Sequence, residues 1–308
     1  MLVVPAYAKV NLALEVTGRR PDGWHDVATA LCTVDWHDLA GVHLCRRSGP
    51  AALRLSGPFA EGVPPGEDNL AVRAAALLLR IAGATGFGFE LWLSKQVPAA
   101  AGLGGGSADA AAVLRAGSTL LAAQGAAVAP EELTAAAAEL GSDVPAVLAG
   151  GGLLAGGRGE RLAPLRVPTL HLAIAVAGAS VTAAAYAALT DEERRATGRV
   201  ARLAAALEED EVPAALLGSA LEAAACRAAP GLADSLARLR ALTPQTPWHL
   251  TGSGGAAFAV AAGAAEAASL AASARNAGFP ARACRTVATR LGPLPPRAGR
   301  AAEGPSRG

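Results

Sequence analysis

Four glycines within five residues, from Gly102 to Gly106, constrain this chain more than any other feature. Ser107, Asp109 and a run of helix-forming residues follow at once. Glycine lets backbone N–H groups crowd together because no Cβ stands in the way. A helix that starts behind such a turn adds free N–H groups and the positive end of its dipole. The run therefore predicts a phosphate-binding turn, with a purely structural turn into a helix as the alternative.

The spacing excludes the two best-known phosphate loops. A P-loop needs a lysine directly after its last glycine, and Ser107 stands there instead. A dinucleotide fingerprint that began at Gly102 would need glycine at the position of Ser107. A Rossmann-type oxidoreductase is therefore excluded as far as spacing allows.

Composition limits the partners and the compartment. The 308 residues suffice for one large or two ordinary domains, and the net charge of +1 without a basic stripe argues against a nucleic acid partner. The apolar stretches 171–189 and 256–272 are rich in Ala and interrupted by polar residues or Gly, which predicts core and no membrane span. No signal peptide precedes the first strand, so we expect a cytoplasmic protein with free thiols. The histidines and cysteines have no metal-site spacing, and no metal site is predicted.

The alternation of residues 3–17 predicts a strand with Lys9 and Asn11 side by side on one face. A cleft-facing pair is the functional interpretation, and a solvated edge face is the alternative. A further strand at 87–94 would deliver Lys95 and then the glycine run, which is the order that a phosphate site requires. Other elements expected in this half are strands at 31–45 and 51–57 and a helix at 69–82.

Asp143 is predicted to lie on a tight turn between two helices. Gly141 ends the expected helix 130–140, and Pro145 suits the first turn of the next helix. By itself such an aspartate is most simply a helix cap. A hairpin is expected just beyond, around Leu153 and Leu154.

The character of the chain changes after about residue 165, which predicts an N-terminal domain at 1–165 and a C-terminal α+β domain at 166–291. Residues 292–308, rich in Pro, Gly and Arg, are expected to be a disordered tail. Elements expected in the second domain are strands at 169–177 and 282–288, a strand–glycine turn–strand unit from Trp248, and helices at 182–189, 200–209, 213–226, 231–242 and 263–277.

Six motifs occur in the order of a known family. They are Ala8-Lys9-Val10-Asn11-Leu12, Arg19-Arg-Pro-Asp-Gly-Trp-His25, Asp68-Asn69-Leu70, the glycine run, Leu140-Gly-Ser-Asp-Val-Pro145 and Thr251-Gly-Ser-Gly254. Over roughly residues 5 to 290 the chain resembles the 4-diphosphocytidyl-2-C-methyl-D-erythritol kinases. These belong to the galactokinase, homoserine, mevalonate and phosphomevalonate (GHMP) kinase superfamily.

The resemblance implies an α+β, two-domain GHMP-kinase-like fold with the active site between the domains. It implies ATP- and Mg²⁺-dependent phosphorylation of the 2-hydroxyl of 4-diphosphocytidyl-2-C-methyl-D-erythritol, in the non-mevalonate route to isoprenoid precursors. By the same resemblance, Asp143 accepts or orients the proton of the attacking hydroxyl. Lys9 stabilises the transferring phosphoryl group and keeps Asp143 ionised, and Asn11 contacts the acceptor's hydroxyl groups.

The resemblance also assigns two binding sites. Cytidine would stack between Trp24 and Tyr186, with His25 on its polar edge and Thr182 nearby. Core aromatics are the alternative for Trp24 and Tyr186, and surface polar residues are the alternative for two of the ATP positions, Asn69 and Lys95. The residues implied for ATP are Asn69, Lys95, Pro98, Ala99, Ala100, Ala101, Gly102, Leu103, Gly104, Gly105, Gly106, Ser107 and Ala108.

Two rival functions stay open at this point. One is another kinase of the superfamily that acts on homoserine or a mevalonate-like alcohol. The other is a catalytically silent nucleotide-binding protein. No acidic residue is an obvious Mg²⁺ ligand, so the ion is expected to be bound mainly by the nucleotide phosphates. The expected partner is a small molecule, and the expected assembly is a monomer or a weak homodimer.

Overall fold

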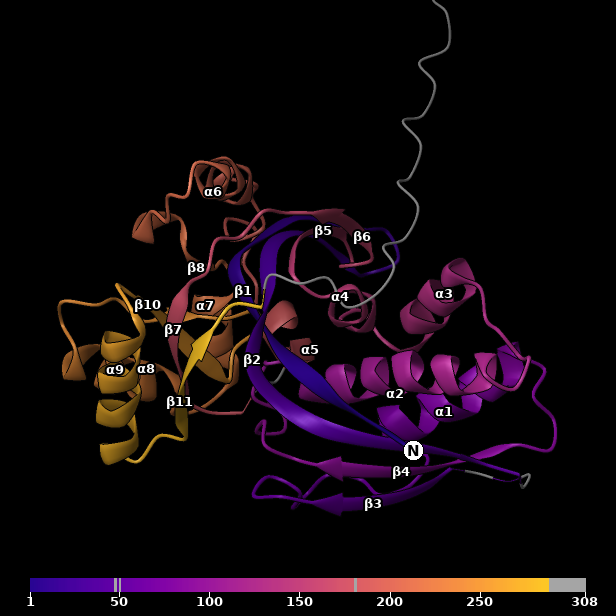
Figure 1. Cartoon of the computed structure of the whole chain (residues 1–308). Helices are drawn as coiled ribbons and strands as arrows, with labels where there is room; N and C mark the ends of the chain where they lie inside the picture. The colour runs from indigo at the N-terminus through magenta and orange to yellow at the C-terminus, as the bar shows by residue number, and fades with distance from the viewer. Residues whose placement is uncertain (47–48, 50, 180–181, 288–308) are drawn as a thin grey trace, which may run out of the picture.

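The computed structural model describes residues 1–46, 49, 51–179 and 182–287 (Figure 1). The expected disordered tail at 292–308 lies outside these residues. Within them, two β-sheets lie side by side, and helices cover each of them (Figure 1). None of the helices in these ranges is long and apolar enough to cross a membrane.

The first sheet is built on two long antiparallel strands, β1 (Leu2–Arg19) and β2 (His25–Cys45). The alternating stretch of β1 is buried on both faces, so Lys9 and Asn11 do not lie on a solvated edge. The other strands of this sheet are β3 (Ala52–Ser56) and β4 (Gly88–Ser94) beyond β2, β8 (Gly218–Ser219) beside β1, and β5 (Gly152–Gly157) with β6 (Arg161–Pro164) on a branch from β2.

An Ala- and Leu-rich helical layer covers one face of this sheet (Figure 1). The close packing within it depends on Gly117, where a Cβ would lie 2.5 Å from a Leu78 methyl carbon and 3.1 Å from the Phe89 ring. The helices of this half are α1 (Leu70–Ile81), α2 (Gly105–Ala122), α3 (Pro130–Leu140) and α4 (Val144–Ala149). Their apolar faces and the sheet form one buried core.

The second sheet has the strand order β11 (Ala281–Arg285), β7 (His171–Val176), β10 (Ala256–Ala261) and β9 (His249–Leu250). Helices α8 (Leu232–Leu242) and α9 (Ala264–Asn276) pack on it around Trp248. The shorter helices, which come between β7 and β9 in the sequence, lie beside the sheets (Figure 1). They are α5 (Thr182–Ala187), α6 (Arg199–Glu208) and α7 (Glu222–Ala228).

The two halves share a buried core. Val10 and Leu103 from the first half pack in one cluster with Phe258 from the second. A single bridge between Val34 and Thr286 also links β2 to the chain after β11. The domain boundary at 165–166 stays a prediction. It falls between β6 and β7 in the sequence, but β8, which comes after the boundary, pairs with β1 of the first sheet.

Two expectations from the sequence were wrong. Residues 213–226 do not form one helix, because Gly218, with a φ of +100°, interrupts the run. The segment instead forms a 3₁₀ turn (Ala214–Leu216), then β8, then α7. The hairpin is also displaced: Leu153 and Leu154 lie within β5, and the chain reverses after Gly157, where φ is +70°.

Glu15 in β1 caps the start of α6. Its buried carboxylate accepts hydrogen bonds from the N–H groups of Thr197, Arg199 and Val200 at 2.7, 3.1 and 3.0 Å, and one from the Thr197 hydroxyl at 2.5 Å. Burial alone raises the pKa of Glu15, but these hydrogen bonds outweigh it and hold the pKa below its ordinary value. Glu15 therefore ties the second half of the chain to β1.

We predict that Glu15→Gln lowers the free energy of unfolding at pH 7 by about 1–3 kcal/mol, because a charge-assisted acceptor is lost. Since the folded pKa is lowered, the stabilisation is present above the unfolded pKa and is lost as the pH falls through the folded value. Urea unfolding at pH 7 and pH 3 checks both points. Glu139→Gln, which removes an exposed pair with Arg80, is the control. Equal stability of wild type and Glu15→Gln at pH 7 would contradict the capping role.

Candidate active site

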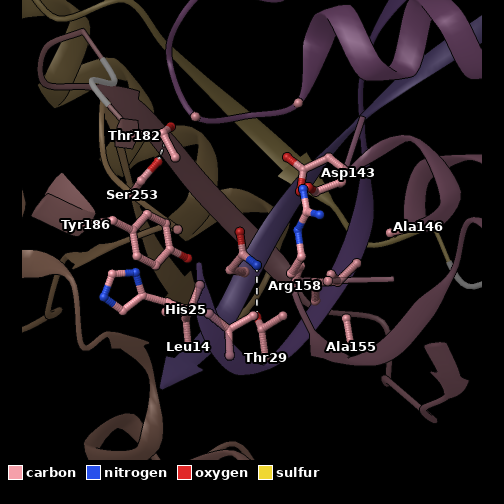
Figure 2. A pocket seen from close by; sticks show the side chains of 18 of the residues that line it. Leu14, His25, Thr29, Asp143, Ala146, Ala155, Arg158, Thr182, Tyr186 and Ser253 are labelled. Carbon is pink, nitrogen blue, oxygen red and sulfur yellow. Dashed lines mark hydrogen bonds between the residues drawn. The ribbon is translucent and has the colours of Figure 1, made fainter. Parts of the chain in front are cut away.

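Two cavities meet at the glycine run. The first, of about 660 Å³, is lined by β1, β2 and α5 and by the turns before α4 and after β9 (Figure 2). The second, of about 380 Å³, lies on the side of α1. Gly102, Gly104, Ser107 and Thr182 line both cavities. The glycine run therefore lies where a ligand in one cavity would meet a ligand in the other.

The glycine run contacts a second glycine turn, backbone against backbone. Gly102 has a φ of +76°, and a Cβ there would lie 2.1 Å from the carbonyl oxygen of Gly254. A Cβ on Gly255, whose φ is +93°, would lie 2.7 Å from the backbone of Ala101. Only glycine allows this approach. The Thr251–Gly254 motif is thus brought against the glycine run across the two halves of the chain.

Helix α2 begins at the end of the glycine run, as the sequence predicts. Gly104 is its N-cap, in the left-handed conformation with φ +71°. The N–H groups of the first helical residues have no carbonyl partner four residues back in the helix. They and the helix dipole make this terminus suited to an anion. Ser107, in the first turn, lines both cavities.

Lys9 and Asn11 lie side by side, as the alternation of β1 predicts. The Lys9 ammonium donates to Asn11 Oδ1 at 2.8 Å, and the Lys9 N–H donates to the carbonyl oxygen of Leu103 at 2.9 Å. The Asn11 N–H donates to the hydroxyl of Thr251 at 2.8 Å, and its amide nitrogen donates to the hydroxyl of Thr29 at 2.8 Å. Both side chains are buried yet line the first cavity.

Asp143 is the N-cap residue of α4, but its side chain makes no capping hydrogen bond. One carboxylate oxygen instead lies 3.4 Å from the Lys9 ammonium, and the side chain is 48% exposed to the first cavity (Figure 2). The capping alternative for this residue therefore does not hold. An ammonium beside an open carboxylate can stabilise negative charge and accept a proton from a hydroxyl at one place.

The residues implied for ATP gather around the second cavity. Asn69, Lys95 and every residue from Pro98 to Ser107 line it. Ala108 does not, because it is buried in α2 against the helical core. Asn69 caps α1: its oxygen accepts from the Ala71 N–H at 2.9 Å, and its amide donates to the Pro64 carbonyl at 2.8 Å. Its contact with ATP stays a prediction.

Lys95 is buried, not a surface residue, and two carboxylates hold its ammonium, a pairing that no sequence motif indicates. Asp38 in β2 and Asp109 in α2 both accept from it, the latter at 2.5 Å. Burial raises the pKa of Asp109 to about 7; the charge of Lys95 opposes this rise and that of Asp38 adds to it. Oδ1 of Asp109 has no hydrogen-bond partner among the described residues. If the Lys95 ammonium contacts ATP, it does so while it is also bound by these two carboxylates.

The residues implied for cytidine line the first cavity together. Trp24 is 52% exposed, so it is not a core aromatic. The His25 and Tyr186 rings stack, with centroids 5.2 Å apart and an interplanar angle of 27° (Figure 2). Burial lowers the pKa of His25, with help from the charges of Arg194 and Arg19, which favours the neutral imidazole. Thr182 and Ser253 line the cavity above Tyr186 and hydrogen-bond to each other at 2.7 Å (Figure 2).

Comparison with known proteins assigns the family. Residues 69–151 match the model described as GHMP kinases N terminal domain. The chain is 40% identical over 270 residues to the 4-diphosphocytidyl-2-C-methyl-D-erythritol kinase of Moorella thermoacetica. The aligned segment covers 85% of this chain and 90% of that protein. The chain belongs to the 4-diphosphocytidyl-2-C-methyl-D-erythritol kinase family. The Thermus thermophilus member of this family is 38% identical and covers 84% of this chain.

Solved structures agree with the family and with the fold. The crystal structure of a 4-(cytidine 5'-diphospho)-2C-methyl-D-erythritol kinase superposes with a TM-score of 0.76 at 37% identity, covering 92% of this chain and 98% of that one. A homoserine kinase from Cytophaga hutchinsonii superposes at 0.66 with 17% identity, which bears on the fold alone. The mixed α+β arrangement expected from the sequence is therefore confirmed as the GHMP kinase fold.

The contact between the two glycine turns gives a testable stability prediction. Gly102→Ala should lower the free energy of unfolding by more than about 2 kcal/mol, because it combines a left-handed φ with a clash against backbone. Urea unfolding checks this. Gly66→Ala, where nothing lies within 4 Å, is the matched control and should change stability little. A Gly102→Ala variant as stable as the Gly66→Ala variant would contradict the contact.

The buried Lys95 group gives a second prediction. Lys95→Met leaves Asp38 and Asp109 facing each other without a cation, and should lower the free energy of unfolding by about 3–5 kcal/mol. Adding Asp109→Asn to that variant should restore part of the loss, because one of the two buried carboxyl groups that face each other is removed. Urea unfolding of both variants measures this. A double variant that is less stable than Lys95→Met would contradict the electrostatic account.

Proposed function

We propose that this chain transfers the γ-phosphoryl group of ATP to the 2-hydroxyl of 4-diphosphocytidyl-2-C-methyl-D-erythritol, in the non-mevalonate route to isoprenoid precursors. The observation that carries the proposal is the meeting of two cavities at the N-terminus of α2, with Lys9 and Asp143 beside the junction. Family membership supplies the reaction, and this geometry supports the assignment of residues to it.

The second cavity would hold ATP, with its phosphates directed at the glycine run. Gly102 to Ser107 line that cavity, and the first N–H groups of α2 face the junction. ATP use is common to the family. We propose that Asn69 and the backbone around Lys95 border the adenosine, since both residues line the same cavity.

The first cavity would hold the acceptor. Its aromatic residues Trp24, His25 and Tyr186 suit a base, and Lys9 and Asp143 line the same cavity. Burial, together with the charge of Asp143, raises the pKa of the Tyr186 hydroxyl to about 12, so it stays protonated as a donor. A cytidine-bearing alcohol would thus place its hydroxyl near Asp143 while its base stacks on the aromatic rings.

Phosphoryl transfer needs positioning and charge stabilisation more than covalent chemistry. In this proposal the Asp143 carboxylate accepts the hydrogen bond of the attacking hydroxyl and takes its proton as the new P–O bond forms. The Lys9 ammonium, 3.4 Å from that carboxylate, keeps it ionised and faces the negative charge that develops on the transferring group. Asn11, fixed by Thr29 and Thr251, orients Lys9 and contacts the acceptor.

Mg²⁺ fits this site as an ion that arrives with the nucleotide. Among the described residues, no group of three or more His, Cys, Asp or Glu side chains is placed to hold a metal. Mg²⁺ commonly binds through one or two protein oxygens plus substrate phosphates. The hydroxyl of Ser107 and the carboxylate of Asp143, which line the first cavity with the glycine run, are the oxygens we propose for it. When bound, the ion would neutralise phosphate charge.

The activity test is acceptor-dependent ADP release. Wild-type protein with ATP and 4-diphosphocytidyl-2-C-methyl-D-erythritol should release ADP, and Asp143→Asn should lower kcat by about 10²–10⁴-fold while ATP still binds. Asp191→Asn, at an exposed aspartate outside both cavities, is the matched control and should retain wild-type kcat. ATP binding without acceptor-dependent ADP release would contradict the proposed acceptor.

Thermal stability with ligands separates this function from its rivals. Because aromatic rings line the base end of the first cavity, CDP should raise Tm, whereas homoserine and mevalonate should not. A shift with homoserine or mevalonate and none with CDP would favour the other kinases of the superfamily. Binding of CDP and ATP without turnover would favour the silent nucleotide-binding protein, which the contact between Lys9 and Asp143 argues against.

A further inference from the structure

Arg158 covers the exposed ring of Trp24. It lies at the tip of the β5–β6 hairpin between Gly157 and Gly159, whose φ values are +70° and +115°. Its guanidinium carbon is 3.7 Å from the centroid of the Trp24 ring. A flat cation therefore lies on one face of the aromatic residue that the proposed function assigns to cytosine.

The first cavity carries an excess of positive charge. The basic side chains that line it are those of Lys9, Arg19 and Arg158, and the acidic one is that of Asp143. Lys9 is paired with Asp143, but within the described residues no carboxylate pairs with the guanidinium of Arg158. Arg19 also has no carboxylate partner among the described residues, whereas two nearby arginines outside the cavity are paired, Arg20 with Asp22 and Arg194 with Asp191. The described part of the cavity wall thus keeps two cations without a carboxylate partner, and Arg158 is the one that lies on the Trp24 ring.

Arg158 also lies on the way to the reacting groups. Figure 2 places its side chain on the same side of the cavity as Asp143, with His25 and Tyr186 across from them. In the proposed acceptor a diphosphate links the nucleoside to the alcohol that is phosphorylated. That diphosphate would therefore lie between the aromatic rings and Asp143, within reach of the Arg158 side chain, which lines the same cavity.

We propose that Arg158 holds the place of the base on Trp24 in the free protein and binds the diphosphate of the acceptor once the base displaces it. This inference rests on the proposed function and adds a residue that determines specificity. The guanidinium suits both positions, because it stacks flat on aromatic rings and its paired N–H groups match phosphate oxygens. No covalent step is involved, and the hairpin backbone need not move.

The proposal predicts different effects on ligands with and without the diphosphate. Arg158→Ala should weaken CDP binding by about 10–100-fold, the usual loss for hydrogen bonds to a charged group. Cytidine binding should not weaken, because the base no longer has to displace the guanidinium. The salt dependence of CDP binding should also decrease, since one cation fewer faces the phosphates. Isothermal titration calorimetry of the full chain with CDP and with cytidine measures all three effects.

Two further variants complete the experiment. Arg158→Lys keeps the charge without the flat fork, and should bind CDP with an affinity between those of wild type and Arg158→Ala. Arg161→Ala removes an exposed arginine on the same hairpin that lines neither cavity, and should bind both ligands as wild type does.

The outcomes separate failure of this inference from failure of the proposed function. Equal weakening of CDP and cytidine in Arg158→Ala would mean that Arg158 only supports the Trp24 ring, and would overturn the proposal. Unchanged CDP binding in that variant would overturn it as well. A wild-type protein that binds neither CDP nor cytidine would contradict the proposed function itself, and the role of Arg158 with it.

Discussion

The backbone contact between two glycine turns fixes the geometry on which the candidate site depends. Gly102 meets Gly254, and Gly255 meets the backbone of Ala101, at distances that leave no room for a Cβ on Gly102 or on Gly255. Because the first turn starts α2 and the second follows β9, this contact sets the helix N-terminus against the second sheet. Strand β1 is held by the same turns, since Lys9 bonds to Leu103 and Asn11 bonds to Thr251. These backbone contacts thereby position the N-terminus of α2, the Lys9 ammonium and the Asn11 amide.

Charge is distributed differently around the two cavities. Beneath the second cavity, Lys95 is neutralised by the buried carboxylates of Asp38 and Asp109, which makes it a structural group of the wall. The first cavity keeps an excess of positive charge that reaches toward the glycine run. Two phosphate-bearing substrates brought together there would otherwise repel each other. The arrangement therefore suits an enzyme whose donor and acceptor are both anions.

The local parts of the site could be predicted from the sequence. The glycine run, the turn at Asp143 and the side-by-side pair Lys9 and Asn11 follow from glycine spacing, helix stop signals and alternation. Contacts between distant segments could not be predicted in this way. Asp38 lies 57 positions from Lys95 and belongs to no motif, and Arg158 faces Trp24 only because β5 pairs with β2.

The same limit explains why residues 213–226 were wrongly expected to form one helix: the two residues of β8 pair with β1, and this pairing overrides helix propensity.

The proposed function depends on where the two substrates meet. A crystal structure with 4-diphosphocytidyl-2-C-methyl-D-erythritol and a non-hydrolysable ATP analogue therefore tests it most directly. It predicts the γ-phosphate at the N-terminus of α2 and the acceptor's 2-hydroxyl within hydrogen-bond distance of Asp143. An acceptor whose 2-hydroxyl lies away from both Asp143 and the γ-phosphate would contradict it.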